Sequence, residues 1–166
     1  MSKLLQQQGK MIDVGDIAPD FILTDNMGIS RSLLDTAAEQ YVVLVFYRGD
    51  WCPYCQLQMR ELGKSMAQFD EKGGVLWGIS PQKHEINQAF AEKREIPFPI
   101  VWDEGQQVIS EWGLIHELDP HQSEIPYPTT YIIGAGNQVV WRHIADDHIG
   151  NRPQTSEILA ALPARS

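Results

Sequence analysis

Residues 41–55, YVVLVFYRGDWCPYC, place the strongest constraint on how this chain folds. The apolar, β-branched run from Tyr41 to Tyr47 has the length and composition of a fully buried strand. A short polar turn follows the run. Pro53 then favours the first position of a helix, where its missing N–H is no loss and its fixed φ is already right. The sequence therefore predicts a buried strand that passes through one tight turn directly into a helix.

The only two cysteines of the chain, Cys52 and Cys55, lie where this helix is expected to begin. If Pro53 is the first helical residue, Cys52 is the N-cap and its sulfur faces the free N–H groups of the first turn. These amides and the helix dipole favour an anion, so they lower the pKa of the thiol. Cys55 falls on the inward stripe of the helix with Met59 and Leu62. We interpret the pair as a redox dithiol in which Cys52 attacks and Cys55 resolves.

Metal binding and a permanent disulfide are the competing interpretations of the two cysteines. A close pair in a chain without secretory features suits catalysis or metal binding better than a structural disulfide. A structural zinc site needs four ligands, and the five histidines show no paired spacing that would complete one. We therefore expect no metal and no cofactor. The redox chemistry requires that the two sulfurs lie close together and that solvent can reach at least one of them.

The remaining pattern is that of an α/β domain with a mixed sheet. A hairpin is predicted near the N-terminus and another near the C-terminus, and strands and helices alternate between them. The expected elements are strands at 21–24, 29–32, 75–80, 97–102, 131–133 and 139–144, helices at 53–69, 84–95, 106–112 and 151–162, and a loop with one short strand at 114–127.

Charge and hydropathy exclude several classes of partner. The formal net charge of −9 disfavours nucleic acid and anionic membrane surfaces. No run approaches the ~20 apolar residues of a transmembrane helix. The first ten residues, MSKLLQQQGK, lack the features of a secretory signal. We expect a cytoplasmic protein.

Several segments of the chain resemble the thioredoxin superfamily. The resemblance rests on Trp-Cys-Pro-Tyr-Cys after the first core strand and on Tyr-Pro-Thr-Thr before the last hairpin. Within that superfamily, APDFILTDNMG at 18–28, YRGDWCPYCQLQMREL at 47–62 and the tail at 128–159 resemble the AhpC/TSA, or redoxin, family. They are most similar to its peroxiredoxin-like members that carry Cys-x-x-Cys.

This resemblance covers about residues 14–163 and implies a fold. We expect one thioredoxin-like domain over residues 1–166, with a central mixed β-sheet, helices on both faces and an N-terminal β-hairpin extension. The resemblance also implies a cis proline at Pro128, beside the cysteines. A proline that opens a strand at a thiol-binding site fits that expectation.

The match departs from ordinary members of the family at the cysteines. Those members have Pro-x-x-x-Thr-x-x-Cys at this turn, with the peroxidatic cysteine last. Here the same register is Arg48-x-x-x-Cys52-x-x-Cys55. Cys55 therefore occupies the peroxidatic position and Cys52 replaces the threonine. Attack that begins at Cys55 is thus the alternative to attack by Cys52.

The family's active-site arginine is the second departure, because its position is occupied by Pro128. Arg48, Arg142 and Arg152 are candidates for a substitute guanidinium, and the spacing does not decide among them.

The resemblance implies a thiol-dependent antioxidant oxidoreductase that cycles a Cys52–Cys55 disulfide to reduce peroxides or protein disulfides. A thioredoxin-type protein or a low-molecular-weight thiol would be its reductant, and a homodimer is compatible with the sequence. The alternatives are a thioredoxin-like thiol–disulfide oxidoreductase without peroxidase activity and a non-catalytic redox sensor. Supporting or substrate-binding roles are expected for residues that could equally be ordinary turn, core or surface residues: Arg48, Asp50, Trp51, Pro53, Tyr54, Pro128 and Thr129.

Overall fold

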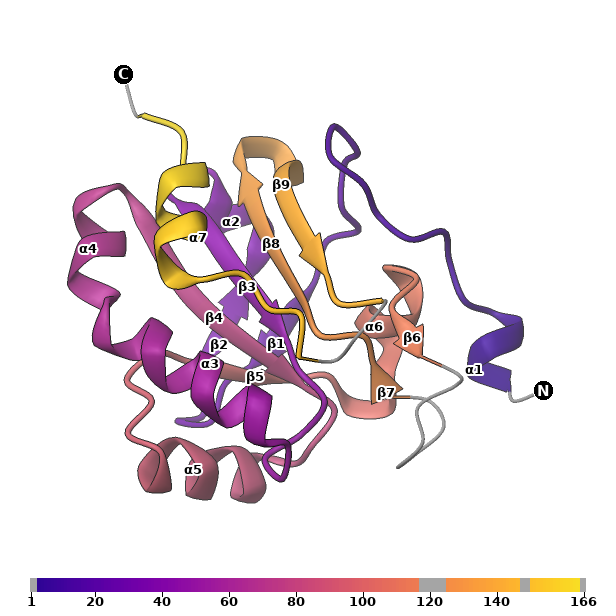
Figure 1. Ribbon diagram of the computed structural model, residues 1–166. Helices are drawn as coiled ribbons and strands as arrows, with labels where there is room; N and C mark the ends of the chain where they lie inside the picture. The colour runs from indigo at the N-terminus through magenta and orange to yellow at the C-terminus, as the bar shows by residue number, and fades with distance from the viewer. Residues whose placement is uncertain (1–2, 117–124, 147–149, 165–166) are drawn as a thin grey trace.

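The protein is built around a five-stranded mixed sheet (Figure 1). The computed structural model describes residues 3–116, 125–146 and 150–164. Strand β3 (Tyr41–Phe46) lies at the centre, parallel to β4 (Gly74–Ser80) and antiparallel to β8 (Thr129–Gly134). Strands β5 (Ile100–Trp102) and β9 (Gln138–Ile144) form the two edges. This arrangement confirms the predicted central mixed sheet.

Helices cover both faces of this sheet, as expected. Figure 1 shows α3 and α7 in front of the strands and α2 behind them. The front layer consists of α3 (Pro53–Lys64), α4 (Met66–Glu71), α5 (His84–Lys93) and α7 (Thr155–Ala161). The layer behind consists of α2 (Leu33–Ala37) and α6 (Gln107–Glu111).

Two hydrophobic cores lie between the sheet and these layers, and β3 contributes to both. Val42, Leu44 and Phe46 pack with α2 and α6, whereas Val43 and Val45 pack with the front layer. Side chains alternate between the two faces of a strand, so a strand covered on both faces is apolar at every position. The front core also contains both cysteines, which places the dithiol between the sheet and α3.

Shorter elements extend the sheet region. The predicted N-terminal hairpin is confirmed, because β1 (Ile22–Thr24) pairs antiparallel with β2 (Ser30–Ser32). Its turn is tied to β5 by the side chain of Asn26, which accepts from the Ile100 N–H at 3.0 Å. The other short elements are α1 (Lys3–Gln6), the 3-10 helices η1 (Glu104–Gln106) and η2 (Ala135–Asn137), and the paired strands β6 (Ile115–His116) and β7 (Ile125–Pro126). Most of the predicted loop between β6 and β7, residues 117–124, lies outside the described residues.

The helix predicted from 53 to 69 is two helices in the structure. It breaks at Ser65, whose φ of −103° and ψ of 11° are not those of a regular helix. Serine competes for backbone hydrogen bonds and so favours helix ends. Phe69 is nevertheless fully buried in the front core, so the apolar stripe continues although the helix does not.

Gly63 allows α3 to approach the segment that follows α5. A Cβ at this position would lie 2.6 Å from Cδ of Pro97, and a proline ring has little freedom to move away. We predict that Gly63→Ala lowers the free energy of unfolding by about 1–3 kcal/mol, because overpacking outweighs the gain of about 1 kcal/mol in helix propensity. Urea unfolding measures this. Arg60→Ala, on the exposed side of the same helix, is the control and should change stability by less than about 0.5 kcal/mol. A more stable Gly63→Ala variant would contradict the close contact.

Candidate active site

The turn between β3 and α3 has the predicted geometry. Cys52 is the N-cap of α3, with the extended values φ −83° and ψ 116°, and Pro53 is the first helical residue. The Cys52 N–H donates to the Gly49 carbonyl at 3.3 Å, and the Cys52 carbonyl accepts from the Gln56 N–H at 2.9 Å. The backbone therefore holds Cys52 between the turn and the first turn of the helix, as the sequence indicated.

The two sulfurs lie beside two guanidinium groups. Arg152 Nη2 is 3.3 Å from Cys55 Sγ and 3.9 Å from Cys52 Sγ. Arg48 Nη1 is 3.6 Å from Cys52 Sγ. These contacts answer the question that spacing left open, because Arg142 instead donates to the Ile12 carbonyl at 2.7 Å. Arg48 and Arg152 are the arginines at the dithiol.

The environment separates the pKa values of the two thiols. The pKa of Cys52 is lowered to about 5, mainly by a hydrogen bond from the Cys55 thiol; burial opposes this, and the Cys55 backbone N–H, Arg152 and Arg48 add to the lowering. The second thiol therefore lowers the pKa of Cys52 most, and the backbone N–H of Cys55 in the first turn of the helix lowers it further, ahead of the two arginines. Burial, and then donation to Cys52, raise the pKa of Cys55 well above its usual value. The proton of the pair therefore resides on Cys55.

This difference between the two pKa values favours the predicted roles of the two cysteines. The thiolate is the nucleophilic form of cysteine, so Cys52 has the character of the attacking residue. Cys55 lies within hydrogen-bonding reach and holds a proton that it can give up when it resolves. The alternative, attack that begins at Cys55, has the shorter contact to Arg152 in its favour.

Both cysteines are fully buried, with 0% of either residue exposed. The expectation that solvent reaches at least one sulfur is therefore not met in this structure, and the expected chemistry would require the covering side chains to move. Arg48 is 3% exposed, and its guanidinium carbon lies 4.8 Å from the centre of the Trp51 ring. The Trp51 ring is itself exposed to solvent. Gly49 allows this arrangement, since a Cβ there would collide with the indole nitrogen of Trp51. Trp51 thus shields Arg48, and Arg48 shields Cys52.

A pocket of about 560 Å³ lies beside Arg152. It is lined by Tyr54, Leu57 and Gln58 of α3 and by Arg152 and Pro153 of the segment before α7. Tyr54 and Leu57 are exposed. The expected contact role of Tyr54 stays a prediction. Because Arg152 both lines the pocket and contacts the sulfurs, its side chain connects the pocket with the dithiol.

Asp50, the middle residue of the turn, makes hydrogen bonds with the side chains of two glutamines. Its N–H donates to Gln82 Oε1 at 2.9 Å, and its Oδ1 accepts from Gln82 Nε2 at 2.9 Å. Its carbonyl accepts from Gln56 Nε2 at 2.7 Å. The turn that carries Arg48 and Cys52 is therefore fixed at its centre by side chains from other segments.

The prediction of a cis peptide bond at Pro128 was wrong, because no described residue has a cis peptide bond. Pro128 leads into β8 as extended chain, and its carbonyl accepts from the Ala145 N–H at 2.9 Å beyond the end of β9. A trans bond continues the strand pairing through this point. Thr129 pairs with Phe46 at the end of β3, and its hydroxyl donates to the Tyr127 carbonyl at 2.9 Å. Pro128 and Thr129 thus lie at the end of the sheet where β3 leads into the cysteine turn. Their hydrogen bonds are made to backbone groups of Ala145 and Tyr127.

Sequence reasoning missed three residues of the site, Gln56, Gln58 and Gln82. Gln58 Oε1 accepts from Arg152 Nη1 at 2.8 Å, and Gln58 Nε2 donates to Thr130 Oγ1 at 3.3 Å. Its signal was a polar residue three positions after Cys55, on the inward face of the helix. Gln82 carried no comparable signal, because it lies in the connection between β4 and α5.

Groups of metal ligands and helices able to cross a membrane are both absent from the described residues. Within residues 3–116, 125–146 and 150–164, no three His, Cys, Asp or Glu side chains gather into a cluster able to hold a metal ion. No helix in those ranges has both the length and the apolar character of a membrane span.

Comparisons with known proteins point to one family. The AhpC/TSA family profile matches residues 14–142. Peroxiredoxin Q from Sedum lineare is 34% identical over 119 residues, which are 72% of this chain and 62% of that protein. The chain thus spans less than two thirds of that relative. The Peroxiredoxin Q of Oryza sativa subsp. japonica is 30% identical over 91% of this chain and 68% of its own length.

The solved structures agree on the fold. Peroxidoxin BcpB from Mycobacterium tuberculosis superimposes with a TM-score of 0.80 at 25% identity, over 92% of this chain and 97% of that one. The expected thioredoxin-like fold is thereby confirmed.

The hydrogen bond between the two sulfurs can be tested by titration. We predict that Cys55→Ala raises the pKa of Cys52 by about 1–2 units, since a hydrogen bond to a charged group contributes about 1.5–3 kcal/mol. Cys55→Ser retains a donor at this position and should raise the pKa less. The ultraviolet absorbance of the thiolate as a function of pH measures both variants without requiring a reagent to enter the buried site. Equal midpoints in wild type and Cys55→Ala would contradict the assigned proton.

Proposed function

Because this chain belongs to the AhpC/TSA family, we propose that it is a thiol-dependent peroxidase that cycles Cys52 and Cys55 between dithiol and disulfide. The observation that carries the proposal is a pair of hydrogen-bonded thiols, one with its pKa lowered to about 5, between two guanidinium groups. A thiolate is the form that attacks a peroxide. Guanidinium groups also stabilise the negative charge that develops on the leaving oxygen.

The proposed reaction has two chemical steps. In the first, the Cys52 thiolate attacks the terminal OH oxygen of the peroxide, the O–O bond breaks, and the alkoxide or hydroxide that leaves takes a proton from solvent to become the alcohol or water. Cys52 is then a sulfenic acid. In the second step, Cys55 attacks the Cys52 sulfur, the S–O bond breaks and water leaves with the Cys55 proton. The disulfide that results spans the first turn of α3.

A thiol reductant is needed to complete the cycle. We propose a thioredoxin-type protein or a low-molecular-weight dithiol, which would attack the disulfide through a mixed-disulfide intermediate and restore both thiols. A cytoplasmic location is proposed with it, since a reducing compartment keeps a close cysteine pair reduced. Homodimer formation stays a prediction.

Disulfide reduction is the second candidate function. Cys-x-x-Cys at a helix start, with the first thiol strongly acidic, is also suited to thiol–disulfide exchange. In that case Cys52 attacks a sulfur instead of an oxygen. A dithiol that oxidises without turning over either substrate would instead act as a redox sensor.

Stopped-flow oxidation distinguishes these functions. We predict that reduced wild-type protein consumes hydrogen peroxide far faster than free cysteine does at the same pH, and that Cys52→Ser abolishes this. The second assay is reduction of insulin disulfides by the same preparation. Peroxide consumption no faster than that of free cysteine, together with ready insulin reduction, would contradict the peroxidase. Failure of both assays while the Cys52–Cys55 disulfide still forms would favour the sensor.

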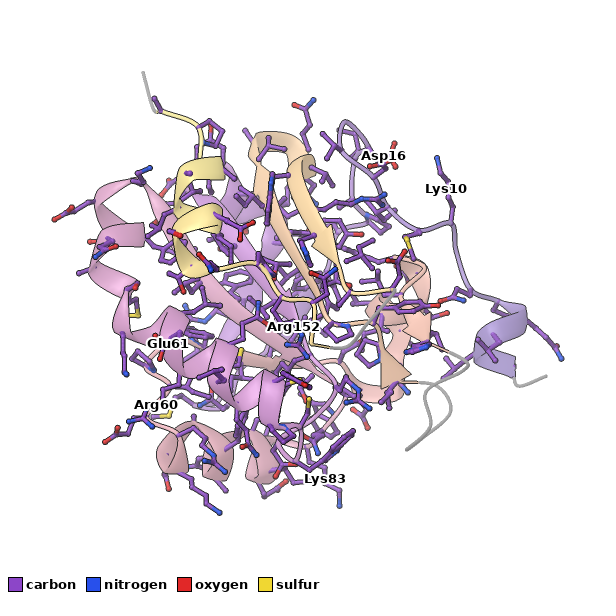
Figure 2. The ribbon with its side chains drawn as sticks, viewed as in Figure 1. Lys10, Asp16, Arg60, Glu61, Lys83 and Arg152 are labelled. Atoms are coloured by element: carbon purple, nitrogen blue, oxygen red, sulfur yellow. The ribbon has the colours of Figure 1, made fainter. Side chains whose placement is uncertain are left out.

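Arg152 provides a second test of the same proposal. Arg152→Met keeps much of the side-chain length and removes the charge beside both sulfurs, so it should slow oxidation by about tenfold or more. Arg60→Met is the matched control, because Arg60 is exposed on α3 and points outward, away from Arg152, in Figure 2. Equal oxidation rates for the two variants would contradict the role of Arg152.

A further inference from the structure

The middle of the active-site turn is held by one residue from outside the cysteine motif, Gln82. The Gln82 side chain makes two hydrogen bonds to Asp50, one to its backbone and one to its carboxylate. The pair is reciprocal: Gln82 Oε1 accepts from the Asp50 N–H, and Gln82 Nε2 donates to Asp50 Oδ1. Two bonds in this arrangement fix both the position and the orientation of Asp50. We call this pair of hydrogen bonds between Gln82 and Asp50 the clamp.

Gln82 can hold the turn because it is itself anchored. Its N–H donates to Ser80 Oγ at 3.0 Å, at the end of β4. Its carbonyl accepts from Asn87 Nδ2 at 2.9 Å, and Asn87 is fully buried in α5. The clamp therefore connects the active-site turn to the central sheet and to α5.

Without this clamp, the centre of the turn keeps the hydrogen bond from Gln56 Nε2 to the Asp50 carbonyl at 2.7 Å but loses both bonds that orient the Asp50 N–H and carboxylate. The turn contains Gly49, and glycine has the greatest backbone freedom. Arg48 and Cys52 lie two residues before and two residues after Asp50, and their Nη1–Sγ contact is 3.6 Å. A small shift of the turn changes that contact and moves Trp51 relative to Arg48. Fixing Asp50 thus fixes both ends of the charge pair.

We propose that Gln82 is a positioning residue that, by clamping Asp50, sets the distance between the Arg48 guanidinium and the Cys52 sulfur. This inference rests on the proposed function, because it concerns the same thiolate. It adds a residue that neither the cysteine motif nor the family resemblance singled out. Gln82 itself makes its side-chain contacts with Asp50, so it acts on the sulfur only through the turn.

Arg48 is one of several groups that stabilise the Cys52 thiolate, so the clamp controls only part of that stabilisation. Cys55 faces the Cys52 sulfur from α3, Arg152 from the segment before α7 and Arg48 from the turn. Tyr47 lies near Cys55, and burial raises its pKa so that it stays neutral. Cys55 and Arg152 do not depend on the turn, so loss of the clamp should weaken thiolate stabilisation without abolishing it.

Four variants test the proposal. Gln82→Ala removes both bonds, and Gln82→Glu places a carboxylate against that of Asp50. The double variant Gln82→Glu/Asp50→Asn again pairs a donor with an acceptor between the two side chains, and it removes one of the two facing carboxylates. Gln88→Ala is the control, because Gln88 is exposed on α5.

The measurements are the pH midpoint of thiolate absorbance, the rate of oxidation by peroxide and the urea midpoint. Gln82→Ala should raise the pH midpoint by about one unit, which corresponds to about a tenfold lower thiolate population at acidic pH. Gln82→Glu should raise it further, and the double variant should bring it back toward wild type. Gln88→Ala should match wild type. A purely structural role would change the urea midpoint alone.

The outcomes separate this inference from the proposed function. If the Gln82 variants titrate like wild type, or if the double variant shows no recovery relative to Gln82→Glu, the positioning role is wrong. If wild type titrates at low pH but consumes no peroxide, the peroxidase proposal is wrong while the positioning of the thiolate stands. Should Gln82→Ala fold poorly, the comparison between Gln82→Glu and the double variant still decides.

Discussion

The stabilisation of a buried thiolate is the interaction on which the rest of this site depends. Removing an anion from water costs several kcal/mol unless hydrogen bonds and opposite charge offset it. Here Cys55 donates to the Cys52 sulfur, and two guanidinium groups lie within 4 Å of it. The three partners come from α3, from the turn before it and from the segment before α7. The fold is therefore required to bring three separate parts of the chain to one sulfur atom.

The local part of this arrangement could be predicted from sequence. The buried strand and the N-cap position of Cys52 follow from patterns within residues 41–55, and the inward position of Cys55 follows from the apolar stripe that it shares with Met59 and Leu62. Arg152 could not be chosen in the same way, because it lies 100 residues from Cys52. Gln82 is 32 residues from Asp50 and belongs to a connection without periodicity. Such contacts depend on how the strands are ordered in the sheet, which local patterns do not specify.

The wrong prediction at Pro128 has the same origin. A proline before a strand beside a cysteine pair is compatible with either isomer, and the family resemblance favoured cis. The structure continues the pairing of β8 with β9 through the Pro128 carbonyl and Ala145, and the trans bond fits that pairing. The break at Ser65 was missed for a similar reason. The apolar stripe continues on both sides of Ser65, so the pattern gave no sign that the backbone leaves the helix there.

The groups that stabilise the thiolate also block the way to it, so reactivity and access are coupled. Arg48, under the Trp51 ring, contacts Cys52, and Arg152 contacts both sulfurs and lines the neighbouring pocket. A cation–π contact at a partly exposed site contributes about 0.5–2 kcal/mol, and a minor state a few kcal/mol higher is populated at about 0.1–10%. Side-chain motion can therefore open the site while α3 stays in place, since Met59 and Leu62 anchor that helix in the front core. Both cysteines lie at the start of the same anchored helix, so the disulfide that we propose would close within its first turn.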